Sequence, residues 1–111
     1  MSSEDPAVTL INVVEIPADQ IDQFMVGWKQ RADIMSTLPG FRDYALHQAL
    51  LPESRFQLVN VAHWDSREAF ETAMANPEFH SLRTAVQGEL DVTGNAALYQ
   101  VALSDHAGQA D

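Results

Sequence analysis

The sequence predicts one α+β domain of the ferredoxin-like type, a four-stranded antiparallel sheet with both helices on one face. Short stretches rich in β-branched residues alternate with longer stretches of helical periodicity. Their order along the chain is β-α-β-β-α-β. The length of 111 residues suits a single core. In this pattern we expect the first and third strands to lie side by side and parallel at the centre of the sheet.

The first half of the chain supplies a strand and a long helix. Residues 8–16, VTLINVVEI, are short and β-branched, which indicates a buried strand. A helix should then begin with Asp19 as its N-cap and end at Leu38-Pro39-Gly40. Its apolar stripe falls at helical spacing and comprises Ile21, Phe24, Met25, Trp28, Ala32 and Met35.

The second half supplies a hairpin, a helix and a last strand. Residues 41–50 and 55–64 read as two strands joined by a turn. Asp65 should open the second helix with Glu68 as its capping partner, and Ser66 as the first helical residue. Residues 96–103, AALYQVAL, should form the fourth strand. We expect a flexible arm over residues 1–7, the domain over 8–103 and a flexible tail over 104–111.

Composition excludes several classes of function. The chain has no cysteine, which excludes disulfides and thiolate sites, and its formal net charge of -10 argues against binding a phosphate backbone. No apolar run approaches the roughly 20 residues that span a bilayer, and the first residues do not show the basic region followed by an apolar region that is typical of a signal peptide. We therefore expect a cytoplasmic protein that binds neither nucleic acid nor membrane.

The sheet face without helices should be apolar. It would carry Ile11, Val13, Val59 and Val61, which are too apolar to be left in water. Homodimerisation through this face is the simplest remedy.

Polar side chains interrupt the two central strands. Asn12 and Asn60 lie near the strand centres, and Trp64 follows Asn60 by four residues and so shares its face. A buried carboxamide without partners costs roughly 1–3 kcal/mol. The amides could bond to each other, to Tyr44 or to a water. Alternatively, they donate to a ligand oxygen in a pocket between sheet and helices, with Trp64 as a flat wall. Trp64 by itself is also typical of a core aromatic.

The remaining residues give no cofactor site. The histidines lack the spacing of a helical metal site, and no glycine-rich phosphate loop or nucleophile elbow occurs. His63 should point toward the dimer side. His47 is either a partly exposed strand residue or a general base. Further apolar pocket walls are expected from Phe24, Trp28, Phe70, Phe79 and Leu82, and Tyr44 and His47 are further candidates for substrate binding.

Three stretches resemble the antibiotic biosynthesis monooxygenase family, which belongs to the dimeric α+β barrels. They are LPGF at residues 38–41, LHQALLPESRFQLVNVAHWDSREAF at 46–70 and NPEFHSL at 76–82. The resemblance implies a ferredoxin-like dimer. It also implies cofactor-independent oxygenation of an electron-rich aromatic, such as an anthrone or hydroquinone, with O₂. Asn60 and Trp64 match a pocket pair of those enzymes, Asn12 matches a first-strand asparagine, and Phe70 matches a second-helix aromatic that is a tyrosine in some members.

Three other functions remain as alternatives: haem degradation, ligand binding without catalysis, and cyclisation. Haem-degrading relatives carry a tryptophan and a histidine on the second helix, where this chain has Thr72 and Arg83, so only His80 could replace the axial ligand. A binding module without enzymatic activity would use the same dimer to hold a hydrophobic ligand. A polyketide cyclase would shape a substrate without consuming O₂.

Overall fold

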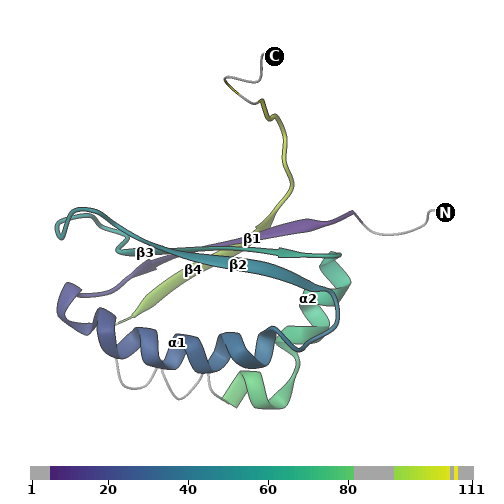
Figure 1. The fold of residues 1–111 in the computed structure, drawn as a ribbon, viewed down its shortest axis with the longest axis horizontal. Helices are drawn as coiled ribbons and strands as arrows, with labels where there is room; N and C mark the ends of the chain where they lie inside the picture. The colour runs from purple at the N-terminus through teal and green to yellow at the C-terminus, as the bar shows by residue number, and fades with distance from the viewer. Residues whose placement is uncertain (1–5, 82–91, 106, 108–111) are drawn as a thin grey trace.

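The computed structural model describes residues 6–81, 92–105 and 107, and it confirms the predicted ferredoxin-like α+β fold. The strands are β1 (Val8–Glu15), β2 (Phe41–Gln48), β3 (Leu58–Trp64) and β4 (Thr93–Tyr99). The helices are α1 (Ile21–Met35) and α2 (Arg67–Met74), with a 3-10 turn, η1 (Ala18–Gln20), before α1 and a helical stretch over residues 77–81. Both helices cover the same face of the sheet (Figure 1).

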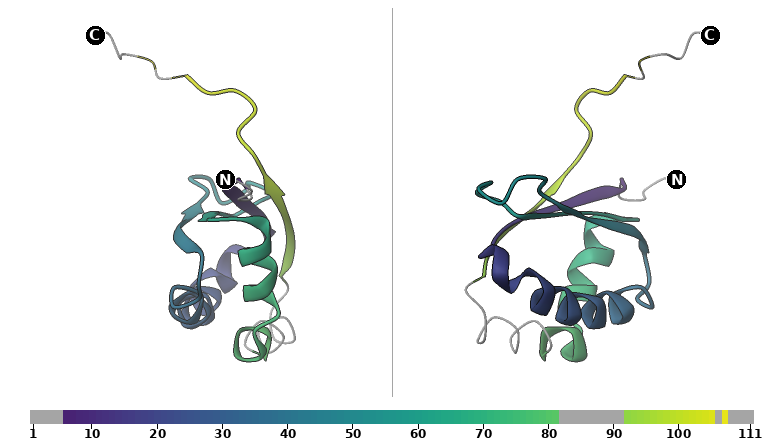
Figure 2. Two further views of the ribbon diagram at one scale, coloured as in Figure 1. Left: turned by 90° about the vertical axis from the view of Figure 1, so that its right-hand side faces the viewer. Right: turned by 60° about the vertical axis from the view of Figure 1, so that its left-hand side comes forward.

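The sheet is antiparallel throughout, in the order β2-β3-β1-β4. The expectation that β1 and β3 run parallel is therefore wrong. Helix α1 returns the chain so that β2 runs in the direction of β1, and the hairpin then reverses it into β3. Figure 2 shows both helices beneath the sheet and the segment after β4 leaving on the opposite side.

The register of the central strands gives each face its character. In β1 and β3 the buried positions alternate, so Leu10 and Val14 share the helix-covered face with Leu58 and Ala62. These residues belong to the core between sheet and helices. The other face carries half-buried residues, which are Ile11, Val13, Val59 and Val61.

Two predicted helix starts are wrong. Helix α1 follows η1 and has Gln20 at its N-cap position without a side-chain hydrogen bond, so Asp19 does not cap it. Helix α2 is capped by Ser66, whose Oγ accepts a hydrogen bond from Ala69 N at 3.1 Å. Asp65 Oδ1 instead accepts a hydrogen bond from Arg42 Nε at 2.6 Å.

The strand bounds differ from the expected ones mainly in β4. It covers Thr93–Tyr99 and pairs with β1 from Glu15 to Thr9, so residues 100–103 lie beyond the strand. Val101 and Leu103 are exposed there. Among the described residues, no helix is long and apolar enough to cross a membrane.

Candidate active site

A cavity of about 420 Å³ lies between the sheet and the helices. This volume falls within the usual range of small-molecule sites. The sheet contributes Leu10, Asn12, Val14, Asn60, Val92, Gly94 and Ala96, counting the residue just before β4. The helices contribute Phe24, Trp28, Arg31, Ala32, Met35, Phe70, Met74 and Phe79. The wall is therefore mostly apolar, with three polar side chains.

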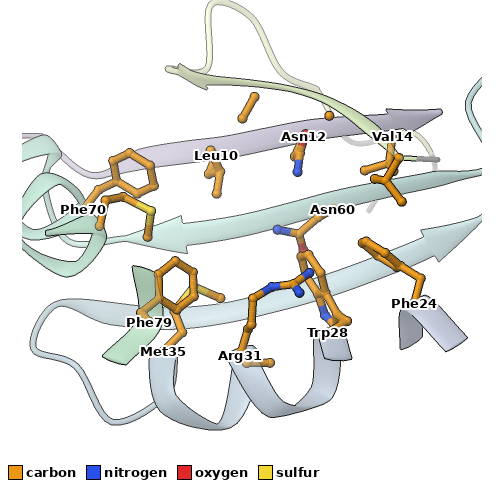
Figure 3. A pocket seen from close by; sticks show the side chains of 15 residues that line it. Leu10, Asn12, Val14, Phe24, Trp28, Arg31, Met35, Asn60, Phe70 and Phe79 are labelled. Atoms are coloured by element: carbon orange, nitrogen blue, oxygen red, sulfur yellow. The ribbon is translucent and has the colours of Figure 1, made fainter. Parts of the chain in front are cut away.

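Two of these polar side chains are the asparagines of the central strands. Asn12 and Asn60 are direct partners in the β1–β3 register, and both lie on the helix-covered face. Figure 3 shows them projecting from the sheet toward α1. Asn60 is only 1% exposed, yet the Oδ1 atoms of both amides are buried without a hydrogen-bond partner. Neither carbonyl therefore accepts a hydrogen bond from the other amide or from Tyr44.

Small residues on β4 leave space beside Asn12. Ala96 is its register partner, and a Cβ atom added at Gly94 would lie 3.2 Å from Asn12 Oδ1. That separation is tighter than ordinary van der Waals contact, so a larger residue at Gly94 would displace the amide. The small residues of this edge strand thus leave room for the Asn12 amide.

The third polar side chain, Arg31, was not predicted. Arg31 is 7% exposed, and its guanidinium carbon lies 5.4 Å from the ring centroids of both Phe24 and Trp28. It is the only charged residue in the described cavity wall. Positions 24, 28 and 31 share one helix face, and this spacing was the available signal. Basic residues are mostly exposed in proteins, so the sequence favoured an outward position.

Trp64 does not line the cavity, so the expectation that it forms a pocket wall is wrong. It is 0% exposed. Its ring packs edge-on against Phe41 at 5.2 Å and against Phe70 at 5.8 Å between centroids. Phe70 is the cavity-lining residue, and Trp64 supports it from behind. The alternative interpretation of Trp64 as a core aromatic therefore holds.

Tyr44 and His47 also lie outside the cavity wall. Tyr44 is half-buried and packs edge-on against Trp28, with 6.1 Å between ring centroids. His47 pairs with Val59 on the helix-free face, where its Nδ1 lies 3.3 Å from Val59 O. The sheet separates it from Asn60, so the suggestion that His47 acts as the base in this cavity is wrong. His63 lies on the same outer face, as expected, with its Nδ1 2.6 Å from Asp43 Oδ1.

The remaining candidates are one expected pocket wall, Leu82, and the three residues considered for haem binding, Thr72, His80 and Arg83. Leu82 and Arg83 lie outside the described residues. Thr72 and His80 are exposed, and neither lines the cavity. The described wall thus offers no histidine to haem iron, so its residues do not fit that group. Within the described parts of the chain, no three acidic or histidine side chains are grouped so that they could hold a metal ion.

The structure therefore brings Asn12, Asn60, Phe24, Trp28, Phe70 and Phe79 together around one cavity. Their chemical roles stay predictions. The arrangement can hold a flat apolar ligand whose oxygen atoms meet the amides and the guanidinium.

The fold and the sequence of this chain are similar to those of known proteins. A proposed monooxygenase from Shewanella loihica PV-4 is 35% identical, with a TM-score of 0.74 over 89% of this chain and 97% of that one. SnoaB, a cofactor-independent oxygenase from Streptomyces nogalater, is 25% identical, with a TM-score of 0.75 over 89% of this chain and 96% of that one. A search of curated proteins finds no match. The family model of antibiotic biosynthesis monooxygenases matches residues 7–85, and the chain belongs to that family.

Proposed function

We propose that the protein is a cofactor-independent monooxygenase that oxidises an electron-rich aromatic substrate, of anthrone or hydroquinone type, with O₂. The observation that carries the proposal is the convergence of two central-strand amides on an apolar, aromatic-lined cavity. The family and the similarity to SnoaB support oxygenase chemistry. The apolar wall supports a flat, poorly soluble substrate.

For an anthrone, the reaction balances without an added reductant. The substrate loses a proton from its CH₂ carbon, and the resulting anion passes one electron to O₂. The radical pair joins at that carbon to form a C–O bond, and protonation gives a hydroperoxide. Cleavage of the O–O bond with loss of the C–H proton releases water and leaves a quinone carbonyl. The substrate supplies all four electrons that O₂ accepts.

The protein's task in this chemistry is to bind, orient and stabilise charge. The N–H groups of Asn12 and Asn60 would donate hydrogen bonds to the substrate oxygen on which negative charge develops. Such hydrogen bonds stabilise the charge most strongly in a cavity that excludes water. The unpartnered carbonyl oxygens of the same amides would accept from substrate hydroxyls. Phe24, Trp28 and Phe70 would hold the ring plane.

The test is O₂ uptake by the purified protein with a dihydroxyanthrone and, separately, a hydroquinone. With the anthrone we expect quinone formation at a rate above that of the uncatalysed reaction, unchanged after treatment with a metal chelator. Oxidation of the hydroquinone to its quinone supplies only two electrons, so there O₂ uptake should be matched by release of H₂O₂. With ¹⁸O₂, an anthrone should yield quinone carrying one labelled oxygen, the other appearing in water. Binding without O₂ uptake would instead identify a binding module, and a cyclised product formed without O₂ would identify a cyclase. Haem loss under reductant would require a different site from the one described.

A further inference from the structure

Arg31 places a positive charge in the wall of the cavity, opposite the two asparagines. The residue is buried, and Figure 3 shows its side chain rising from α1 between Phe79 and Trp28 toward the sheet. A guanidinium carries five N–H donors and no acceptor. It is also the side chain best suited to bind a planar oxyanion through two parallel hydrogen bonds.

The two aromatic neighbours define where the guanidinium lies. Its carbon is 5.4 Å from the ring centroids of Phe24 and Trp28, within the range of cation–π attraction. Contact with two rings restricts the side chain before a ligand arrives, so less conformational entropy is lost on binding. The described cavity wall contains no carboxylate that would repel an anion.

The amides complete a pattern that a neutral hydrocarbon would not satisfy. Asn12 and Asn60 each offer donors and a buried, unpartnered carbonyl oxygen, and Arg31 offers donors alone. A ligand that matches all three groups carries one anionic oxygen and at least one further polar oxygen on an aromatic frame.

We propose that the cavity selects aromatic ligands in an anionic form and that Arg31 is the residue that selects the anion over its neutral counterpart. The aromatic nature of the ligand rests on the proposed function, but the charge preference rests on Arg31 itself. A phenolate and an aromatic carboxylate share the required chemistry, an anionic oxygen on a ring, and the experiment separates them.

The experiment measures binding of three probes that O₂ does not oxidise: anthraquinone, 2-hydroxyanthraquinone and anthraquinone-2-carboxylate. Dissociation constants come from calorimetry at neutral pH, with wild type and Arg31→Gln. We expect the variant to bind at least one anionic probe about 10-fold to 100-fold more weakly, since a charge-assisted hydrogen bond is lost. The affinity for anthraquinone should change by less than about 2-fold. The probe affected identifies the oxyanion.

The visible spectrum gives a second readout for the hydroxylated probe, whose absorbance changes on ionisation. If the phenolate is the recognised form, wild type should bind it with a larger anionic fraction than the free probe has. Arg31→Gln should remove that increase. A purely structural role of Arg31 would not move this signal.

Lys29→Gln is the matched control, because it removes the same charge from the outer surface of the same helix. The Lys29 side chain is 69% exposed, and its Nζ lies 2.6 Å from Asp33 Oδ1. The hydrogen bond to Asp33 and the charge of that carboxylate raise the pKa of the Lys29 ammonium above its ordinary value. This variant should bind all three probes as wild type does.

Arg31→Lys keeps the proposal testable if the glutamine variant unfolds, which circular dichroism would reveal. It retains the charge but not the planar fork, so the preference for the anion should weaken without disappearing. Equal weakening of all three probes, no weakening of either anionic probe, or failure of wild type to bind either anionic probe would overturn the proposal. Because no probe is oxidised, this binding test is independent of the O₂-uptake test with an anthrone or a hydroquinone. A charge preference here, together with no O₂ uptake there, would refute the oxygenase and leave the role of Arg31 intact.

Discussion

Replacement of Asn60 by alanine should separate activity from stability. If the amide donates to a substrate oxygen on which charge develops, Asn60→Ala should lower turnover of an anthrone by about 100-fold to 1,000-fold. The free energy of unfolding should change little, because Asn60 Oδ1 accepts no hydrogen bond in the folded protein. The variant loses an amide that contributes little to the stability of the fold.

The expected magnitude follows from two opposing effects. An unpartnered buried carbonyl costs roughly 1–3 kcal/mol, and the alanine variant avoids that cost. Loss of side-chain volume destabilises, but Asn60 borders the cavity, so the vacated volume joins space that already exists. We therefore expect a net change within about 1 kcal/mol, which corresponds to a few degrees in melting temperature.

Leu58→Ala is the matched stability control. Leu58 precedes Asn60 by two residues on β3, faces the same side and is 0% exposed, but it does not line the cavity. Its truncation should cost about 2–5 kcal/mol. Turnover per folded molecule should remain near the wild-type value.

The assay combines thermal unfolding with O₂ uptake and quinone absorbance on the same samples. A structural role for Asn60 predicts the reverse pattern. In that case Asn60→Ala would lower the melting temperature as much as Leu58→Ala does, and its turnover per folded molecule would be unchanged. That result would refute the assignment of Asn60 to the reaction.

Three further predictions concern the core, the outer face of the sheet and one turn. Trp64→Ala should lower the free energy of unfolding by about 3–5 kcal/mol, measured by denaturant titration, because the ring is fully buried against Phe41 and Phe70; a stable variant with weakened ligand binding would contradict this. Val61→Asp should convert a homodimer to monomers in sedimentation velocity, because Val61 lies on the apolar helix-free face beside Ile11 and Ala45; a wild-type chain that is monomeric at micromolar concentration would rule out the dimer. Gly40→Ala should lower the melting temperature by on the order of 5–10 °C, because Gly40 has φ 87° and an added Cβ would lie 2.4 Å from Ala69 Cβ; an unchanged melting temperature would show that the turn can rearrange.

The order of strands and helices could be predicted from the sequence because it depends on local periodicity. The alternation in VTLINVVEI and QLVNVAHW also placed Asn12 and Asn60 on the same face of the sheet, opposite Ile11, Val13, Val59 and Val61. Side chains at every second position of a strand share a face whatever the rest of the fold does. The proximity of the two amides then required only that β1 and β3 be neighbours.

The residue that caps α2 could not be predicted from the local sequence. Asp65 and Ser66 are both suitable caps for α2. In the structure α2 begins at Arg67, so Ser66 is the N-cap residue, and the Asp65 carboxylate pairs with Arg42, 23 residues earlier. A local pattern does not show which of two adjacent groups has a partner on another strand.

By itself, the sequence determined the fold class, the helix-facing side of each central strand and the apolar character of the site. Only the tertiary structure decided which of the inward residues reach the cavity. Phe70 covers Trp64, so the more bulky aromatic became core. Arg31 turned inward because two aromatic rings on its own helix face border a cavity large enough to admit its guanidinium. Periodicity specifies the direction in which a side chain leaves the backbone, whereas the neighbouring side chains decide whether it meets protein or open space.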